Sequence, residues 1–119
     1  MRPRDAGDSP PTADPDTGGG HRPARPLPGG FLLDLEARVP SRDGTRVGLT
    51  RREFALLERL AGHPGRIFTH ADILASVWRG EGGVQPRVID VHVRAIRLKT
   101  TPQVIETWRC AGERLGAAP

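Results

Sequence analysis

The basic side chains of residues 87–99 are the first candidates for chemistry in this sequence. Arg87, Arg94, Arg97 and Lys99 fall within that one short stretch. Guanidinium groups can bond phosphate oxygens and guanine edges, and a small apolar side chain beside them can touch a thymine methyl. The stretch therefore favours nucleic-acid binding. A solvated basic face would show the same residues, and the charges alone leave both interpretations open.

The remaining polar residues do not predict catalysis. The carboxylates of residues 31–119 form no recognisable pair with a neighbouring base, and Ser41 and Ser76 lack a nucleophile-elbow context. The glycines of residues 80–83 are not followed by the Lys-Ser or Lys-Thr of a phosphate-binding loop. We therefore expect no enzymatic activity and no cofactor.

The histidines and the cysteine do not predict a metal site. His63, His70, His92 and Cys110 are scattered without paired ligand spacing. We expect His63 and His70 to be surface residues beside helix ends. A single cysteine also excludes an internal disulfide framework.

Composition divides the 119 residues into a tail and one domain. Residues 1–30 hold seven prolines and six glycines and no aromatic side chain, and their four arginines and four aspartates cancel, so the net charge of +4 lies after them. Such a segment cannot bury enough apolar surface to offset its ordering entropy. We predict a disordered tail at 1–30, a folded domain at 31–115 and a frayed C-terminus at 116–119.

Apolar segments long enough for a membrane are missing from the sequence. A membrane-spanning helix needs a run of about 18 or more apolar residues, and no such run occurs. The N-terminus also lacks the apolar core of a signal peptide. We expect a cytoplasmic protein that does not contact membranes.

The elements that must position the basic stretch begin with strands and a helix. Residues 31–49 read as short antiparallel strands, with Asp43-Gly44 as a strong hairpin signal. Thr50 and Glu53 fit a capping box that starts a helix, which ends near Gly62.

Two further helices and a hairpin complete the predicted domain. A second helix starts at Thr69, and a third runs from Arg87 to about Lys99. The inward stripe of the third helix consists of Ile89, Val93 and Ile96. Residues 104–108 alternate as a strand, 109–112 can turn, and 113–115 can return as its partner. The sequence thus predicts an α+β domain: a β platform, three helices and a C-terminal hairpin.

Five sequence blocks in order resemble the OmpR/PhoB-type winged-helix domain, the effector domain of bacterial response regulators. They are Leu49-Thr50-x-x-Glu53-Phe54-x-Leu56-Leu57-x-x-Leu60, His63-Pro64-Gly65-x-x-Phe68-Thr69, Leu74-x-x-Val77-Trp78, Arg87-x-Ile89-Asp90-Val91-His92-Val93-Arg94-x-Ile96-Arg97 and Ile105-Glu106-Thr107-Trp108-Arg109. Each block alone is weak, but together they are specific.

The resemblance implies a winged helix-turn-helix that binds double-stranded DNA sequence-specifically and regulates transcription. Its third helix would enter the major groove and its wing the adjacent minor groove. The positions that match contacts to phosphate or base are Arg87, His92, Arg94 and Arg97. Val91 matches a position that meets a thymine methyl, Thr107 one that touches phosphate, and Arg109 the wing arginine of the minor groove.

Two other positions carry smaller implications of the same resemblance. Asp90 matches a residue expected to orient a neighbouring arginine. Loop 79–86 matches the segment through which some members touch RNA polymerase.

The chain departs from the family pattern in ways that bear on function. Ala95 stands where arginine is common, and Glu113 replaces the wing tyrosine; we expect Glu113 to place negative charge near the DNA backbone. Only the tail precedes the platform, so we expect no receiver domain, and the oligomeric state is open. The alternative function is a protein-interaction module on a degenerate winged-helix scaffold that has lost DNA binding.

Overall fold

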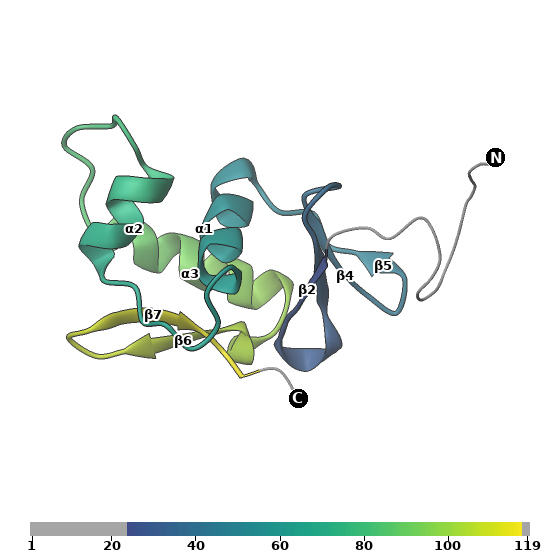
Figure 1. The fold of residues 1–119 in the computed structure, drawn as a ribbon. Coiled ribbons are helices and arrows are strands. Elements are labelled where there is room, and N and C mark those ends of the chain that lie inside the picture. Colours follow the sequence, from purple (N-terminus) through teal and green to yellow (C-terminus); the bar gives the residue numbers. More distant parts are fainter. Residues whose placement is uncertain (1–23, 118–119) are drawn as a thin grey trace.

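The computed structural model describes residues 24–117, which fold in the order strands, three helices, hairpin (Figure 1). The predicted α+β winged helix-turn-helix is therefore confirmed. The disorder expected of residues 1–23 and the fraying expected of 118–119 lie outside the described residues.

A four-stranded antiparallel sheet forms the N-terminal platform. Its strands β2 (Ala24–Pro26), β3 (Leu32–Asp34), β4 (Val39–Arg42) and β5 (Thr45–Arg46) follow one another in sequence order. The turn between β4 and β5 contains Asp43 and Gly44, both with positive φ, as the hairpin signal predicted.

Residues 24–30 belong to the folded structure, in contrast to the predicted boundary at Phe31. Ala24–Pro26 pairs with β3, placing Ala24 opposite Asp34. Leu27 is buried, and its amide donates to the carbonyl of Phe31. An edge strand is held by backbone hydrogen bonds and tolerates proline, so the Pro-rich composition concealed it.

The three helices are α1 (Arg51–Ala61), α2 (His70–Val77) and α3 (Arg87–Lys99). The predicted capping box of α1 is present, and Thr69 and Asp72 form a second one at the start of α2. Before α1, the Thr50 hydroxyl accepts from the Glu53 amide, and the Glu53 carboxylate accepts from the Thr50 amide. Thr69 and Asp72 exchange the same two kinds of hydrogen bond before α2. These bonds satisfy amides that the first helical turn leaves without partners.

The core lies between α1 and the elements that surround it. α1 contacts α2, α3 and the last strand. Its buried side chains are Phe54, Leu56, Leu57, Leu60 and Ala61, together with the carboxylate of Glu53. Opposite them, α3 buries its predicted stripe of Ile89, Val93 and Ile96.

The C-terminal hairpin is the wing: β6 (Ile105–Trp108) pairs antiparallel with β7 (Gly112–Leu115). A short 3₁₀ turn, η2 (Pro102–Val104), connects α3 to it. Glu113 and Phe68 exchange both backbone hydrogen bonds, which fixes the wing to the segment before α2. Gly112 (φ 148°) is required there because a Cβ would lie 1.9 Å from the Phe68 carbonyl oxygen.

The chain beyond the wing remains packed for at least one residue. Gly116, expected to be frayed, is buried and its amide donates to the Val104 carbonyl. Within residues 24–117 no helix has the length and apolar character needed to cross a membrane.

Candidate nucleic-acid interface

Helix α3 has a buried side and an exposed side, and the exposed side carries the predicted reading residues. Arg87, Val91, Arg94 and Leu98 are exposed and recur at spacings of four, three and four, which place them along one side of a helix. We call these four residues the outer face of α3. Val91 is 60% exposed and Leu98 75%, so apolar side chains alternate with the two guanidinium groups.

The arginines of the outer face are available to an anion. The side chains of Arg87 and Arg94 form no ion pair or hydrogen bond with another residue in the described range 24–117. Several other arginines are instead engaged: Arg52 pairs with Glu81 and Arg114 with Glu106. The outer face therefore presents two guanidinium groups that pair with no carboxylate of the described part of the chain.

Arg97 joins α3 to the wing. Its Nε and Nη2 atoms donate to the backbone carbonyl of Ile105, at 3.2 and 2.7 Å, and Nη2 also donates to the Thr107 hydroxyl at 2.9 Å. The two hydrogens on Nη1 take part in none of these bonds. The DNA contacts predicted for Arg97 and Thr107 stay predictions, and both residues also have a structural role.

His92 packs between α3 and the end of α2. Its Nδ1 lies 2.8 Å from the Val88 carbonyl, and since a carbonyl only accepts, Nδ1 carries the hydrogen. The ring meets Trp78 edge-on, with centroids 5.1 Å apart and planes at 84°. Nε2 is left to accept a hydrogen bond, or to donate one when the ring is protonated.

Lys99, the last basic residue of α3, is committed to a carboxylate. Its Nζ lies 2.6 Å from Oε1 of Glu53, whose side chain is almost fully buried. Burial alone would raise the pKa of Glu53, but hydrogen bonds from Lys99 and from the Thr50 amide outweigh it, and the pKa lies below its ordinary value. Lys99 therefore ties the end of α3 to the start of α1.

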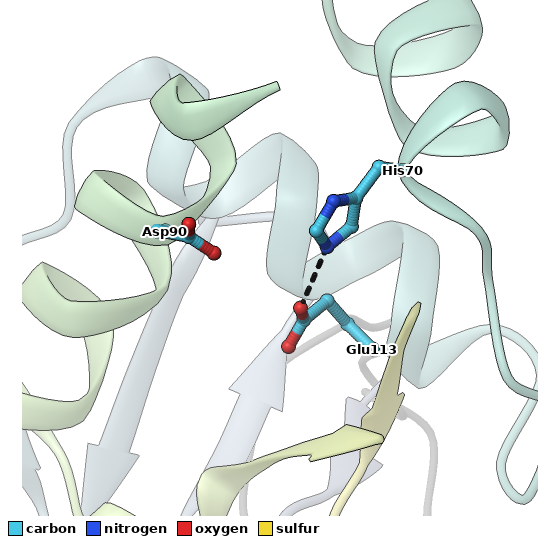
Figure 2. A group of neighbouring side chains, drawn as sticks. All are labelled: His70, Asp90 and Glu113. Atoms are coloured by element: carbon cyan, nitrogen blue, oxygen red, sulfur yellow. Dashed lines mark hydrogen bonds and ion pairs between the residues drawn. The ribbon is translucent and has the colours of Figure 1, made fainter. Parts of the chain in front are cut away.

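Glu113 does not face outward, which corrects the expectation that it adds negative charge at the DNA backbone. Its side chain is fully buried beneath the wing. Oε1 accepts from the Thr107 hydroxyl at 2.7 Å, and Oε2 accepts from Nε2 of His70 at 3.0 Å (Figure 2). His70 was expected to be a surface residue, and its side chain is only partly exposed, at 37%.

The wing turn presents Arg109 to solvent. Residues 109–111 connect β6 to β7, with Cys110 in the left-handed region at φ 65°. Trp108, which the sequence reasoning did not single out, is 44% exposed and lies under the Arg114 guanidinium, 4.8 Å from its ring centroid. The alternating pattern of residues 104–108 could have singled out Trp108, because it places this side chain on the side of the strand opposite to Thr107.

The structure thus groups the predicted site residues other than His92 into three places. Arg87, Val91 and Arg94 share the outer face of α3, Arg97 and Thr107 meet at the joint with the wing, and Arg109 lies on the wing turn. His92 lies against Trp78, half-buried. The predicted arginine partner of Asp90 is not found: among residues 24–117 Asp90 forms no ion pair or hydrogen bond.

Residues 44–115 match the family model described as the C-terminal domain of transcriptional regulatory proteins. The chain belongs to this family. It is 40% identical over 89 residues to the probable transcriptional regulator ycf27 of Guillardia theta, an alignment that covers 69% of this chain and 35% of the relative. It is 38% identical over 91 residues to the phosphate regulon regulatory protein PhoB of Rhizobium meliloti, covering 73% and 40%. The chain thus spans well under half the length of these relatives.

Solved structures agree with this assignment to the OmpR/PhoB type. The DNA-binding domain of CssR from Bacillus subtilis superposes with a TM-score of 0.65 at 30% identity, over 71% of this chain and 98% of that one. The DNA-binding domain of RstA from Klebsiella pneumoniae, solved in complex with the RstA box, gives 0.63 at 27% identity, over 74% and 92%. Both neighbours are named as DNA-binding domains, and both are covered almost completely.

Proposed function

We propose that this chain binds double-stranded DNA in a sequence-specific manner and regulates transcription. The outer face of α3 carries this proposal, because it sets two guanidinium groups that have no partner among residues 24–117 beside an exposed apolar side chain. Major-groove reading needs this combination of donors for guanine edges or phosphates and a methyl contact for thymine. Membership of the family supports the assignment independently of the charges.

The outer face suggests separate roles for its members. Arg94 lies between Val91 and Leu98 on the exposed side, and we assign it to a base edge. Arg87, in the first turn of α3, is assigned to phosphate or base. Val91 is the position for a thymine methyl. We propose that His92 adds a hydrogen bond through Nε2.

The wing supplies the second half of the proposed contact. Arg109 is exposed on the turn between β6 and β7, and a narrow A/T-rich minor groove concentrates negative potential that attracts an inserted arginine. Arg97 would contact the backbone through Nη1 while its other nitrogens hold β6. The Thr107 hydroxyl donates to Glu113, so donation to a phosphate would require this hydrogen bond to break.

Loop 79–86 remains a proposed contact for RNA polymerase. Its first residues, Arg79 to Gly83, are exposed, and Glu81 pairs with Arg52 of α1, which anchors the loop to the helical core. Crosslinking of the DNA-bound chain to RNA polymerase should map to this loop. Crosslinks confined to the platform would contradict the assignment.

Selection of bound duplexes from a random pool, followed by sequencing, tests the proposed function. We expect one enriched motif, with an A/T-rich segment beside the bases read by α3. Recovery of no enriched sequence, together with a protein partner that binds through the outer face and is not displaced by DNA, would favour the protein-interaction alternative.

A further inference from the structure

Three side chains from three separate elements converge beneath the wing. His70 is the first residue of α2, Asp90 lies on α3 and Glu113 on β7. One ligand atom of each lies within 4.8 Å of the others, and Figure 2 shows the three side chains directed toward a common space. Sequence spacing predicted no metal ligands among the histidines, since these residues come together only through the fold.

Negative charge exceeds positive charge in this cluster. Glu113 is fully buried, and Asp90 has no ion pair or hydrogen bond within the described residues. Arg97 is linked to Glu113 only through the hydroxyl of Thr107. A buried carboxylate is costly unless it is paired. Imidazole supplies a positive charge only when protonated, and among residues 24–117 His70 is the only residue that forms an ion pair with either carboxylate.

An outer hydrogen bond orients the buried carboxylate. Thr107 donates to Oε1 of Glu113, which leaves Oε2 directed at Nε2 of His70, 3.0 Å away. Ligating carboxylates in metal sites are held in this way by outer hydrogen bonds. A cavity of about 510 Å³, lined by Thr69, His70 and residues 107–112, reaches the cluster at His70.

We propose that His70, Asp90 and Glu113 form a binding site for a divalent transition-metal ion of the Zn²⁺ class. One imidazole and two carboxylates are a donor set that suits Zn²⁺, and three protein ligands leave a position for water. Tetrahedral ligands around zinc are spaced by about 3.3 Å. His70 and Glu113 are already near that spacing, at 3.0 Å, and the exposed Asp90 has a carboxylate oxygen within 4.8 Å of both ligand atoms.

Metal binding would have two physical consequences. The ion would take the lone pair of Nε2 of His70, so the single hydrogen of the neutral ring moves to Nδ1; because a protonated imidazole cannot ligate, binding weakens as the pH falls. The ion also bridges α2, α3 and β7. Asp90 precedes Val91 of the outer face, so the site lies next to the proposed interface. The proposed site does not depend on DNA binding.

Titration of the full chain, without an affinity tag, with Co²⁺ followed by visible absorption and with Zn²⁺ followed by calorimetry tests the site. We expect one equivalent to bind, and Asp90→Asn and His70→Gln to weaken binding at least tenfold. Asp43→Asn and His63→Gln make the same chemical changes outside the cluster and should bind like the wild type. Asp90→Asn is the decisive variant, because the exposed Asp90 side chain has no hydrogen bond or ion pair to lose within residues 24–117.

Other donors must be separated from the cluster in the same experiment. Cys110 lines the adjoining cavity, so Cys110→Ser should retain binding, and the Co²⁺ spectrum should lack a thiolate charge-transfer band. The absence of saturable binding by the wild type would overturn the proposal. So would binding that Asp90→Asn leaves unchanged, or binding that is lost in Cys110→Ser.

Discussion

Arg97 donates two hydrogen bonds from α3 to the backbone carbonyl of Ile105 in the wing. A single side chain therefore fixes the first residue of β6 relative to the helix proposed to enter the major groove. The forked geometry matters because a carbonyl oxygen offers two lone pairs to two parallel N–H donors. The orientation of the wing therefore depends on a side chain of α3 and not on the hairpin alone.

Arg97→Lys should loosen the wing while keeping the charge of α3. A lysine ammonium cannot reproduce the forked pair, and hydrogen bonds to charged groups contribute about 1.5–3 kcal/mol each. We expect faster amide hydrogen exchange in residues 105–115 with little change in α1. Exchange rates in the wing equal to those of the wild type would contradict the role of the Arg97–Ile105 bonds.

Arg94→Ala should lose about 1–3 kcal/mol of specific DNA affinity and relax preference at one base position, as expected for a bidentate base contact. Binding to individual duplexes from the selected motif, each changed at one position, measures this. Arg46→Ala, an exposed arginine of β5 in the platform, is the matched control and should leave the base preferences intact. If Arg94→Ala binds every duplex like the wild type, the outer face has been misassigned.

Arg109→Ala should reduce the preference for a narrow minor groove. The exposed wing arginine is expected to gain most from A/T-rich segments, where the groove is narrow and its potential most negative. Comparing affinities for duplexes that carry an A-tract or a G/C segment beside the selected motif tests this. The wild type should discriminate between the two duplexes and the variant much less; equal discrimination by both would refute the assignment.

Glu53 should stabilise the fold in a pH-dependent manner. Because its folded-state pKa is lowered, its contribution is present above the unfolded-state value and is lost as the pH falls through the folded-state value. Urea midpoints should show Glu53→Gln to be less stable than the wild type at pH 7. The difference should shrink below about pH 4, where the unfolded-state carboxylate protonates.

Asp43→Asn, in the exposed turn between β4 and β5, is the matched control for that titration. Its stability difference from the wild type should stay small across the same range. A gap between Glu53→Gln and the wild type that grows on acidification would reverse the predicted sign.

Gly112→Ala should destabilise the wing by about 2–4 kcal/mol, because a Cβ would collide with the Phe68 carbonyl and the backbone is at φ 148°. Gly82→Ala lies in the loop after α2, where a Cβ meets nothing within 4 Å. That variant should change stability by less than about 0.5 kcal/mol. Thermal or urea unfolding of both proteins measures the difference, and equal stabilities would contradict the close approach of β7 to Phe68.

Local sequence patterns predicted the helices. The features that the sequence did not predict depend on contacts between residues far apart in the chain. Both capping boxes are encoded within four residues, and the buried stripe of α3 follows from a spacing of three and four. The burial of Glu113 depends on His70, 43 residues away in the chain, and Lys99 is paired with Glu53 across 46 residues. No local pattern reveals these contacts. Strand β2 was missed because its stability comes from backbone pairing with β3.

The affinity of the chain for random-sequence duplexes as a function of salt tests the central claim most directly. If the outer face and the wing engage a DNA backbone, log affinity should fall linearly with log salt, with a slope of about −0.9 for each phosphate neutralised. We expect a slope that corresponds to several phosphates. An affinity independent of salt, or no binding below about 100 µM at low salt, would contradict the account.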